Sequence, residues 1–534
     1  MLNLWPHRYL LSNSSSIYFR SRTQITYSLR HHSAMHSQAT MDRSHQSESA
    51  SSGSSINRVQ SEPSDKPVGC GETKVLKVGP HKFGEFLQTA NIRSSLKTWT
   101  VDSDNSETMR HMETAAKAIR DGNYPVAFPT ETVYGLGANA RDSRAVQGIY
   151  KAKGRPSDNP LIVHISDLDM YTEMAKGLTI SRETSLYVAR YNELVNKFWP
   201  GPLTLLFPKP PNYLAPEVTA GLDTVGLRMP DSALARTLIK LSGVPVAAPS
   251  ANSSTKPSPT TAKHVLHDLN GKIQYILDGG PCNIGVESTV IDGLRDPPLI
   301  LRPGGVGIDD IRECSGWENV QKGYKDESEI GGSAPRAPGM KYKHYSPNAT
   351  VILCEDGFSP TPQSTPGMKF LHLDHRKRAG GKQELGKVEL IAEAPSTNLN
   401  VGILRTKHWN KWLGWERNSS GEATKVLEHC RNETATIDGL AELDYSTANL
   451  FNCDGANSFC IKLVDFHLGR DTQTIASGLF AALREMDKRG VDVIFVEGIE
   501  EDGGGIAAAV MNRARKAASE RRGHSDDGIT KHIY

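Results

Sequence analysis

Positive charge is concentrated in one short segment of the chain. Lys151, Lys153 and Arg155 fall within five residues of one another, beside a glycine and a proline. A guanidinium can bind two phosphate oxygens at once, and lysines add point charge. The spacing therefore predicts a compact anion-binding loop. The alternative is a solvated basic loop that binds nothing.

Hydroxyl and amide side chains follow a predicted buried strand near residue 248. Ser250 and Asn252 come directly after it, and Thr260 precedes a predicted helix over residues 260–269. A hydroxyl at the start of a helix either caps it or helps to bind a phosphate, because the free amides there favour negative charge. Capping is a sufficient explanation for Thr260, but less so for Ser250 and Asn252.

Two arginines end apolar segments. Arg228 follows Val225-Gly226-Leu227, and Arg302 follows Leu299-Ile300-Leu301. A charge in such a place needs a partner. Each arginine is therefore either half of a structural ion pair or a ligand for an anion. His164 lies inside another apolar segment, where the default interpretation is a core histidine with its hydrogen bonds satisfied.

Small hydroxyl residues also stand where strands are predicted to end, which is where open α/β sheets bind ligands. Residues 129–137 read PTETVYGLG and residues 287–290 read ESTV. The chain contains no GxxxxGK[ST] phosphate loop, no GxSxG elbow and no HExxH metal helix. A nucleotide enzyme built on these residues would have to hold phosphate without a Walker loop.

Strand and helix patterns alternate over residues 71–316, the predicted catalytic domain. Helical spacing runs from Ser106 to Gly122, a strand follows at Val126–Phe128, and the series closes with a strand at Leu299–Arg302. Such alternation predicts an α/β fold with an open sheet. The PGP and RPGG turns argue against strict βαβ repetition, so we expect the sheet to be mixed.

A second, smaller domain is predicted over residues 350–520, after a Gly- and Pro-rich linker at 317–349. Its best pattern is helix, strand, glycine turn and helix over residues 479–518. This order is typical of a small Rossmann-like α/β unit. The glycines do not match GxGxxG, so no dinucleotide site is expected. Residues 521–534 are expected to form a frayed polar tail.

Residues 1–70 predict no folded domain. Arginines and serines with no acid before Asp42 are typical of a transit peptide; the alternative is a disordered, serine-rich extension. Met35 and Met41 offer later starts, so we expect a cytosolic protein with a mitochondrial long form.

Seven scattered cysteines without a CxxC pair favour a reducing compartment. No apolar run reaches the roughly 18 residues of a membrane span.

Nine segments in order resemble the threonylcarbamoyl-AMP synthase family, the YrdC-type enzymes: PTETVYGLG, KAKGRPSDNPLIVHI, FWPGPLTLLF, TVGLRMP, PVAAPSAN, KPSPT, GVESTV, LRPGG and PGMKYKHYSP. The linker and second domain resemble the longer, two-domain form. The resemblance implies a YrdC-like twisted open mixed sheet. It also implies that L-threonine, bicarbonate and ATP give threonylcarbamoyl-AMP and pyrophosphate. A separate threonylcarbamoyl transferase would then modify tRNA.

The resemblance further implies roles for single residues. The family's KxR…SxN signature falls on a catalytic set of Lys153, Arg155, Ser250 and Asn252. The threonine site would be formed by Thr132, His164, Arg228, Ala248 and Ser288. The ATP site would be formed by Lys151, Arg155, Asn159, Thr224, Ser250, Ser258, Arg302 and Tyr345. Mg²⁺ would bridge the phosphates with few protein ligands.

Two other functions share parts of this pattern. A basic concave face would also suit a module that binds tRNA or double-stranded RNA without catalysis; the net charge of +2 means that a local patch would have to do this. A hydrogenase-maturation carbamoyltransferase shares the YrdC-like module, but it adds an acylphosphatase domain and CxxC zinc fingers, which this chain lacks.

Because carbamates decompose in water, we expect residues 334–347 to act as a lid.

Overall fold

The structure is a computed structural model of the chain. It describes residues 71–87, 96–122, 124–324, 335, 344–355, 371–372, 389–390, 399–414, 426–436, 442–452, 459–501, 505–525 and 528–533. The expected extension at 1–70 and much of the expected lid lie outside the described residues.

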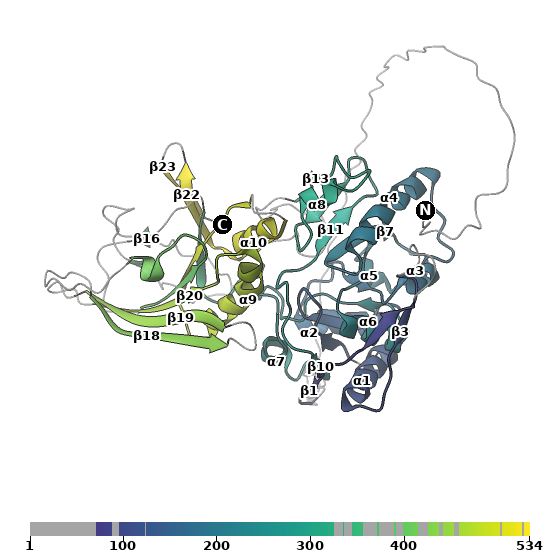
Figure 1. The fold of residues 1–534 in the computed structure, drawn as a ribbon, viewed down its shortest axis with the longest axis horizontal. Coiled ribbons are helices and arrows are strands. Elements are labelled where there is room, and N and C mark those ends of the chain that lie inside the picture. The colour runs from purple at the N-terminus through teal and green to yellow at the C-terminus, as the bar shows by residue number, and fades with distance from the viewer. Residues whose placement is uncertain are drawn as a thin grey trace, which may run out of the picture. The chain divides into compact units, whose positions relative to one another are not determined.

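The first domain is built on an 11-stranded sheet (Figure 1) with the order β1-β10-β4-β5-β9-β6-β8-β7-β11-β12-β13. Parallel and antiparallel pairs both occur, since β8 is parallel to β6 and antiparallel to β7. This confirms the predicted mixed sheet. The strands are β1 Lys74–Lys77, β4 Val126–Phe128, β5 Gly135–Asn139, β6 Ile162–His164, β7 Leu203–Pro208, β8 Thr224–Arg228, β9 Val246–Ala247, β10 Tyr275–Asp278, β11 Thr289–Asp292, β12 Leu299–Arg302 and β13 Gln321–Lys322. A separate hairpin joins β2 Gly84–Phe86 and β3 Trp99–Val101.

Helices pack on this sheet through their apolar faces. Met109, Met112 and Ile119 on one helix are buried against Leu238 and Leu277. The Ser106 hydroxyl caps this helix by accepting a hydrogen bond from the Met109 amide, as its sequence predicts. The helices described in this domain are α1 Glu107–Asp121, α2 Ser143–Lys153, α3 Leu168–Met174, α4 Arg182–Phe198, α5 Pro216–Thr219, α6 Ala233–Ser242, α7 Ala262–Leu269 and α8 Ile308–Arg312.

The predicted cap of α7 is wrong by one residue, and α2 shows a similar arrangement. Asp142 caps α2, while the hydroxyl of the next residue, Ser143, donates to Glu217. Thr261, not Thr260, caps α7, and the Thr260 hydroxyl contacts the ring of His264. A tertiary contact takes the Ser143 side chain, and a contact with His264 of the same helix takes that of Thr260.

The strand β5 was not predicted, because its sequence is rich in glycine. One of these glycines is required by packing: a Cβ on Gly137 would come within 2.6 Å of Phe128 and 2.7 Å of Val246. The absent side chain lets β5 lie between β4 and β9. This brings the loop after β4 next to the loop after β9.

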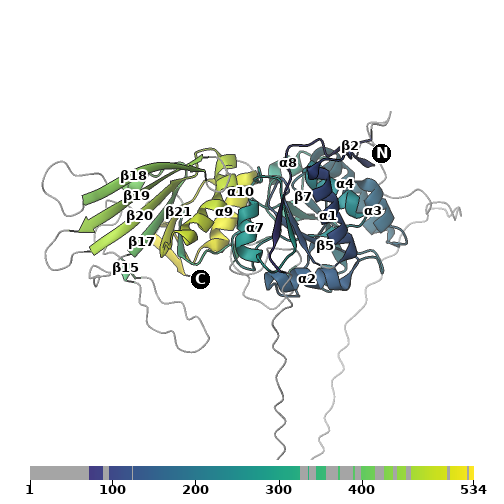
Figure 2. The same cartoon turned by 90° about the horizontal axis from the view of Figure 1, so that it is seen from below.

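The second domain has an eight-stranded sheet with the order β18-β19-β20-β17-β21-β14-β22-β23. Figure 2 shows α9 and α10 side by side on one face of it. The elements of this domain are β14 Thr350–Cys354, β15 Leu371–His372, β16 Glu389–Leu390, β17 Leu399–Arg405, a 3-10 turn at Lys411–Gly414, β18 Val426–Thr436, β19 Glu442–Asn452, β20 Phe459–His467, α9 Thr472–Lys488, β21 Val493–Glu497, α10 Gly505–Ala517, β22 Glu520–Ser525 and β23 Gly528–Ile533.

The expected frayed tail is instead a pair of strands. β22 lies parallel to β14, with Ile352 opposite Glu520, and β23 pairs with β22. The polar side chains are accommodated as ion pairs: Arg522 donates to Glu520 at 2.7 Å, and both are buried. Hydropathy alone reads such residues as solvated, so the sequence pattern could not identify this strand.

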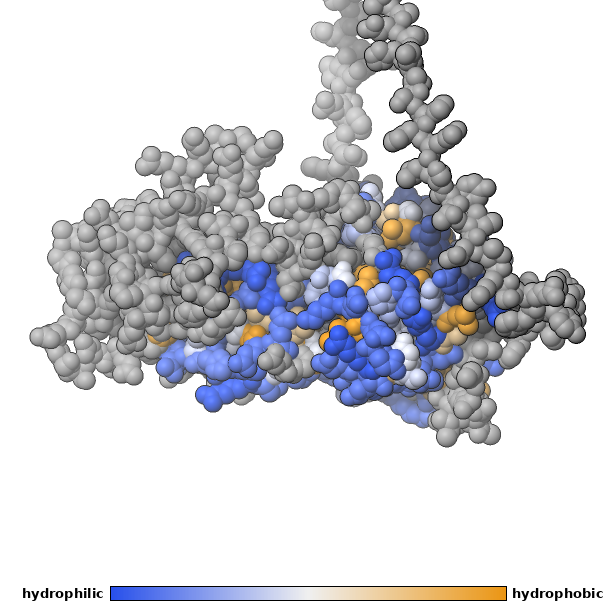
Figure 3. Space-filling view, turned by 90° about the horizontal axis from the view of Figure 1, so that it is seen from above, coloured by the Kyte–Doolittle hydropathy of each residue, from blue (hydrophilic) through white to orange (hydrophobic). Residues whose placement is uncertain are grey.

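The surface differs from the interior as expected for a folded α/β protein. The coloured part of the face in Figure 3 is largely hydrophilic, and its hydrophobic residues lie in separate small patches. Among the described residues, none of the helices has the length and hydrophobicity of a membrane span.

Candidate active site

A pocket forms where loops from distant parts of the first domain are joined by backbone hydrogen bonds. The amide of Leu136 donates to the carbonyl of Pro249 at 2.7 Å, and that of Ala251 to Tyr134 at 2.8 Å. The space between the walls of the pocket, its open mouth included, is about 560 Å³. Its walls comprise Thr130, Thr132, Val133, Gly135, Arg155, Ile162, His164, Arg228, Ala248, Pro249, Ser250, Glu287, Ser288, Arg302, His344 and Tyr345.

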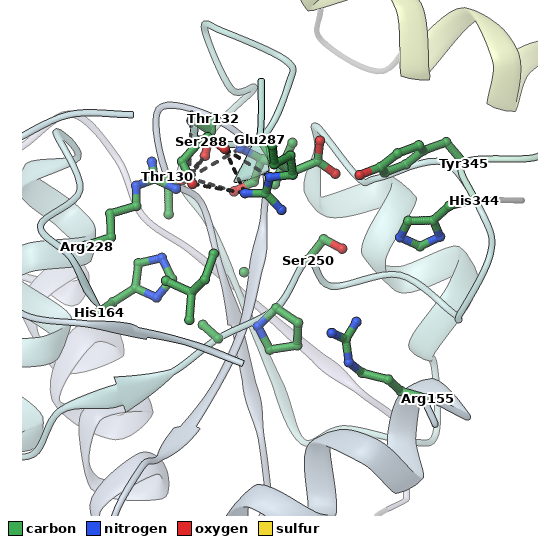
Figure 4. A pocket seen from close by; sticks show the side chains of 16 residues that line it. Thr130, Thr132, Arg155, His164, Arg228, Ser250, Glu287, Ser288, His344 and Tyr345 are labelled. Atoms are coloured by element: carbon green, nitrogen blue, oxygen red, sulfur yellow. Dashed lines mark hydrogen bonds between the residues drawn. The ribbon is translucent and has the colours of Figure 1, made fainter. Parts of the chain in front are cut away.

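The structure thus brings together nine of the predicted site residues, which lie along the pocket in two groups. Figure 4 shows Arg228 and His164 at one end, Arg155 and Tyr345 at the other, and Ser250 between them. We call the first the inner end and the second the outer end. The nine are Thr132, Arg155, His164, Arg228, Ala248, Ser250, Ser288, Arg302 and Tyr345.

Arg228 dominates the inner end from the last position of β8. Its guanidinium donates to the Glu131 carboxylate at 2.6 Å and to the Thr132 hydroxyl at 2.9 Å. The Thr130 hydroxyl lies 2.8 Å from that of Thr132. Arg228 therefore forms an ion pair and also lines the pocket, so the first alternative is confirmed and its role as an anion ligand stays a prediction.

His164 is not a core histidine with its hydrogen bonds satisfied. Its ring lines the pocket from β6, and among the described residues its buried Nδ1 has no hydrogen-bond partner. Burial, and then the neighbouring Arg228, lower the pKa of His164 to about 3. At neutral pH the pocket therefore presents an uncharged imidazole.

Ser288 connects the inner end to Arg302. Its hydroxyl lies 2.8 Å from that of Thr204, and its carbonyl oxygen accepts hydrogen bonds from Arg302 at 2.8 and 3.0 Å. Burial lowers the pKa of Arg302 to about 10, so the guanidinium stays charged at neutral pH. Thr204 lies on β7 within the FWPGPLTLLF segment, but no role was predicted for it from the sequence.

Arg155 lies at the outer end, and Ser250 lies between the two ends of the pocket. Arg155 follows α2 and donates to the carbonyl of Pro160 at 3.0 Å. Burial lowers its pKa to about 10, which again leaves it charged. The Ser250 hydroxyl donates to the Asn252 side chain at 2.6 Å. Both positions were predicted from the sequence.

Lys153 and Asn252 do not line the pocket. The buried Lys153 ammonium donates to the Asn252 carbonyl at 2.6 Å and to the Ser250 carbonyl as well. Burial, and then the nearby Arg155, hold the pKa of Lys153 well below its usual range. These two residues therefore brace the loop that presents Ser250.

The remaining predicted ATP residues lie around the pocket rather than in its walls. Lys151 is exposed on α2. The carbonyl of Asn159 accepts a hydrogen bond from the Tyr150 hydroxyl at 3.0 Å. Thr224 lines an adjacent apolar hollow that shares Ile162 with the pocket. The Ser258 hydroxyl reaches the pocket only through Glu287, to which it donates at 2.6 Å.

The sequence analysis missed the carboxylate of Glu287 as a pocket residue. Burial by itself would raise its pKa, but Arg513 and then Arg302 outweigh it and lower the value to about 2. Arg513 comes from α10 in the second domain and donates to Glu287 at 3.0 Å. The GVESTV segment had singled out this position, although the hydroxyls drew attention instead of the acid.

His344 and Tyr345, near the end of the 317–349 linker, line the outer end of the pocket. Tyr345 packs on Phe480 of α9 with ring centroids 5.2 Å apart. Burial, and then the Glu287 carboxylate to which it is hydrogen-bonded, raise the pKa of Tyr345 to about 12. Burial lowers the pKa of His344 to about 3. The described part of the expected lid thus belongs to the pocket wall.

Comparisons with known proteins agree with this arrangement. Residues 117–304 match the family described as "Telomere recombination", and residues 306–519 match "Threonylcarbamoyl-AMP synthase, C-terminal domain". The threonylcarbamoyl-AMP synthase of Schizosaccharomyces pombe is 40% identical over 465 residues, which is 84% of this chain and 98% of that protein. The Bacillus subtilis enzyme is 40% identical over 428 residues, 80% and 98% of the two chains.

A solved structure is similar over the same length. The crystal structure of Pyrococcus abyssi Sua5 complexed with L-threonine has a TM-score of 0.54 and 35% identity, and the match covers 84% of this chain and 98% of that one. Fold and pocket together define a two-domain α/β protein whose first domain is of the YrdC-like kind. The chain belongs to the threonylcarbamoyl-AMP synthase family.

Proposed function

We propose that this protein is an L-threonylcarbamoyladenylate synthase, which forms threonylcarbamoyl-AMP and pyrophosphate from L-threonine, bicarbonate and ATP. One observation carries the proposal: a single pocket joins a hydroxyl-lined end containing Arg228 to an end lined by Arg155 and Arg302. Such a pocket can hold a hydroxylated amino acid beside a triphosphate. The family relationship supports the same reaction.

The inner end is assigned to threonine. Arg228 would receive the α-carboxylate, since a guanidinium matches a carboxylate in bidentate fashion. Thr132, Ser288 and the neutral His164 would recognise the threonine hydroxyl. The backbone of Ala248, which lines the same wall, would complete the site.

The outer end is assigned to ATP. Arg155 and Arg302 would neutralise charge on the phosphates, with Ser250 and Tyr345 as further contacts. Lys153 and Asn252 would act by holding Ser250, and Ser258 by holding Glu287. Thr224 and Asn159 would lie near the base, beside the apolar hollow. Lys151 would add positive charge at the rim.

The chemistry requires positioning and charge stabilisation more than a protein nucleophile. Bicarbonate takes up a proton and loses water to give carbon dioxide, and the neutral threonine amine then adds to its carbon and releases a proton, which leaves the carbamate. A carbamate oxygen then attacks the α-phosphorus of ATP, and the bond to the β-phosphate oxygen breaks as pyrophosphate leaves. Arg155 and Arg302 would stabilise the charge that develops on the phosphates.

Mg²⁺ would enter with the triphosphate. This ion keeps several waters and needs only one or two protein ligands beside substrate phosphates. The carboxylate that lines the pocket, Glu287, is already hydrogen-bonded to Ser258 and Arg513. The residues present therefore fit a magnesium ion that is bound mainly by ATP. The ion would neutralise part of the negative charge of the phosphates.

The product would pass to a separate threonylcarbamoyl transferase that modifies an adenosine in tRNA. We propose a domain division at 71–316, 317–349 and 350–520, and a cytosolic protein with a mitochondrial long form. Fusing residues 1–41 to a fluorescent reporter tests the mitochondrial long form. Purely cytosolic fluorescence would contradict this part of the proposal.

The test of the function is pyrophosphate release from ATP with threonine and bicarbonate present together or singly. We expect release only with both, and a product whose mass equals threonine plus carbon dioxide plus AMP minus water. Retention of tRNA or double-stranded RNA without pyrophosphate release would instead support the RNA-binding module.

A further inference from the structure

Two pairs of hydroxyl side chains lie at the inner end of the pocket. The hydroxyl oxygens of Thr130 and Thr132 are 2.8 Å apart, and those of Thr204 and Ser288 are also 2.8 Å apart. All four residues are buried. Two hydroxyl oxygens at this distance have a proton between them, because their lone pairs would otherwise repel each other. Which oxygen supplies that proton decides what each hydroxyl can still offer to a ligand.

The proton direction in the first pair is fixed by a backbone carbonyl. The Thr130 hydroxyl lies 2.7 Å from the carbonyl oxygen of Val133, which can only accept, so Thr130 donates its proton there. Because Thr130 has a single proton, the contact with Thr132 must use the proton of Thr132. Thr132 also accepts a hydrogen bond from Arg228 at 2.9 Å. Thr132 therefore presents a lone pair to the pocket that it lines, and no proton.

The second pair presents the opposite polarity. Among the described residues, the Ser288 hydroxyl is the one hydrogen-bond partner of the Thr204 side chain. Thr204 is fully buried and otherwise lines the apolar hollow beside Leu206 and Val290, which accept no hydrogen bond through their side chains. A buried hydroxyl proton without an acceptor is costly, so Thr204 donates to Ser288.

Ser288 then has only a proton left to offer. Its hydroxyl oxygen accepts one hydrogen bond from Thr204 and a second from the Arg302 guanidinium at 3.0 Å. A hydroxyl oxygen has two lone pairs, so both are occupied. Since Ser288 lines the pocket, its own O–H is available to a ligand as a donor.

We propose that Thr130 and Thr204 are positioning residues for amino-acid selection, because they fix Thr132 as an acceptor and Ser288 as a donor. Figure 4 shows Thr132 and Ser288 in the same part of the pocket wall. A ligand group that contacts both must donate and accept at once, which a hydroxyl does and a methyl, an ether or an ammonium group does not. The inference rests on the proposed function, since it takes threonine as the ligand.

The proton directions can be observed without any ligand. Neutron diffraction from crystals of the perdeuterated full-length protein locates the deuterium atoms of hydroxyl groups. We expect the deuterium of Thr132 to point at Thr130, that of Thr130 at Val133, and that of Thr204 at Ser288. A Thr132 deuterium that points into the pocket, or a Ser288 deuterium that points at Thr204, would overturn the inference whether or not the protein is a synthase.

A binding experiment tests the consequence for Thr132. Calorimetry gives the Kd for L-threonine and for its 3-fluoro analogue, in which fluorine has nearly the size of a hydroxyl but cannot donate. We expect wild type to bind the analogue at least tenfold more weakly than threonine. Thr130→Val leaves the Thr132 proton free to turn into the pocket, so this ratio should fall at least threefold. Thr130→Ser keeps the hydroxyl, and its ratio should stay within twofold of wild type.

Thr172→Val on α3 is the matched control. It also removes a hydroxyl that donates to a carbonyl, that of Leu168 at 2.9 Å, but away from the pocket. We expect this variant to bind both ligands like wild type. An unchanged ratio in Thr130→Val, or an equal change in Thr172→Val, would contradict the role of Thr130. If Thr130→Val does not fold, the neutron map still decides.

Thr204 is tested through Ser288. Thr204→Val should raise the Kd for threonine about tenfold, whereas Thr204→Ser should stay within twofold of wild type. In a Ser288→Ala background, Thr204→Val should add less than a twofold change, because Thr204 acts on the ligand through the Ser288 hydroxyl. A full tenfold loss in that background would make Thr204 a packing residue only and overturn its proposed role. Wild-type protein that binds no threonine would refute the proposed function and leave the proton directions readable.

Discussion

The two ends of the pocket hold their arginines in different ways. At the inner end Arg228 is paired with a carboxylate, that of Glu131, so its charge is balanced before any ligand enters. At the outer end Arg155 donates to the backbone carbonyl oxygen of Pro160. Arg302 donates to that of Ser288 and also interacts electrostatically with the Glu287 carboxylate. A carbonyl orients a guanidinium without cancelling its charge.

The difference matches the charges of the proposed ligands. Threonine is a zwitterion, and a balanced site can recognise it by geometry and by its hydroxyl. A triphosphate carries several negative charges, and the Arg155 guanidinium, which is held by backbone carbonyls, favours it at low dielectric. We therefore expect the inner end to control which amino acid reacts, and the outer end to control the rate.

The largest expected effect is at the outer end. Arg155→Ala removes a charged donor from the phosphate site and should cost at least about 2 kcal/mol of transition-state stabilisation, or about 30-fold in kcat/KM for ATP. Steady-state pyrophosphate release measures it. Arg144→Ala on α2, the helix that precedes Arg155, should leave kcat/KM unchanged, because the Arg144 side chain is 83% exposed. An Arg155→Ala enzyme within twofold of wild type would mean that the phosphate site lies elsewhere.

Amino-acid selection by the wild-type protein should show the next effect. Valine has nearly the shape of threonine but would leave the polar groups of the inner end unpaired, so it should be rejected strongly. Serine lacks only a methyl group. We expect it to lose about 1–3 kcal/mol of transition-state binding, so that its kcat/KM is roughly 10- to 200-fold lower than that of threonine. Parallel assays with the three amino acids measure this. Equal use of valine and serine would contradict hydroxyl recognition.

Thr132→Val should weaken threonine without weakening ATP. It removes the hydroxyl that accepts a hydrogen bond from Arg228, and an unpaired buried donor costs about 1–3 kcal/mol. We expect KM for threonine to rise roughly tenfold while the Kd for ATP stays within twofold. A matching rise in the Kd for ATP would show that the two ends are not separate.

The last expectation concerns the pH dependence of stability rather than catalysis. His164 and His344 are buried neutral with pKa values lowered to about 3, whereas an unfolded histidine titrates near 6.5. Below about pH 6.5 the unfolded chain binds protons that the folded chain does not. The free energy of unfolding therefore decreases as the pH is lowered. Glu287, with a pKa of about 2, adds to this fall below about 4.5.

Thermal unfolding between pH 7.5 and 4 checks this expectation. The melting temperature should decline with falling pH, and less steeply in a His164→Gln variant. A melting temperature that rises as pH falls from 7 to 5 would show that these histidines gain protons on folding.

Much of this comparison could be predicted from the sequence, because local patterns determine it. The periodicity of α1, the three residues of β4 and the positions of Arg155 and Ser250 all follow from nearby residues and motifs. Both arginines at strand ends could be recognised as needing partners. Which partner each has, a carboxylate or a carbonyl, depends on loops far away in the chain.

The side-chain partners that could not be predicted from the sequence are set by contacts between residues far apart in the chain. Glu287 and Arg513 are separated by 226 positions, and neither has a local pattern that predicts the other. Lys153 belongs to a basic cluster, yet its ammonium points into the loop of Ser250 and Asn252 rather than to the pocket. Its orientation is set by the packing of α2, which a run of cations does not reveal.

The most direct test of the account is a crystal structure of the protein with L-threonine and a non-hydrolysable ATP analogue bound together. We predict threonine against Arg228 and Thr132, the phosphates against Arg155 and Arg302, and the threonine nitrogen on the side of the α-phosphorus. Two ligands in separate hollows, or phosphates bound at Arg228, would contradict the account.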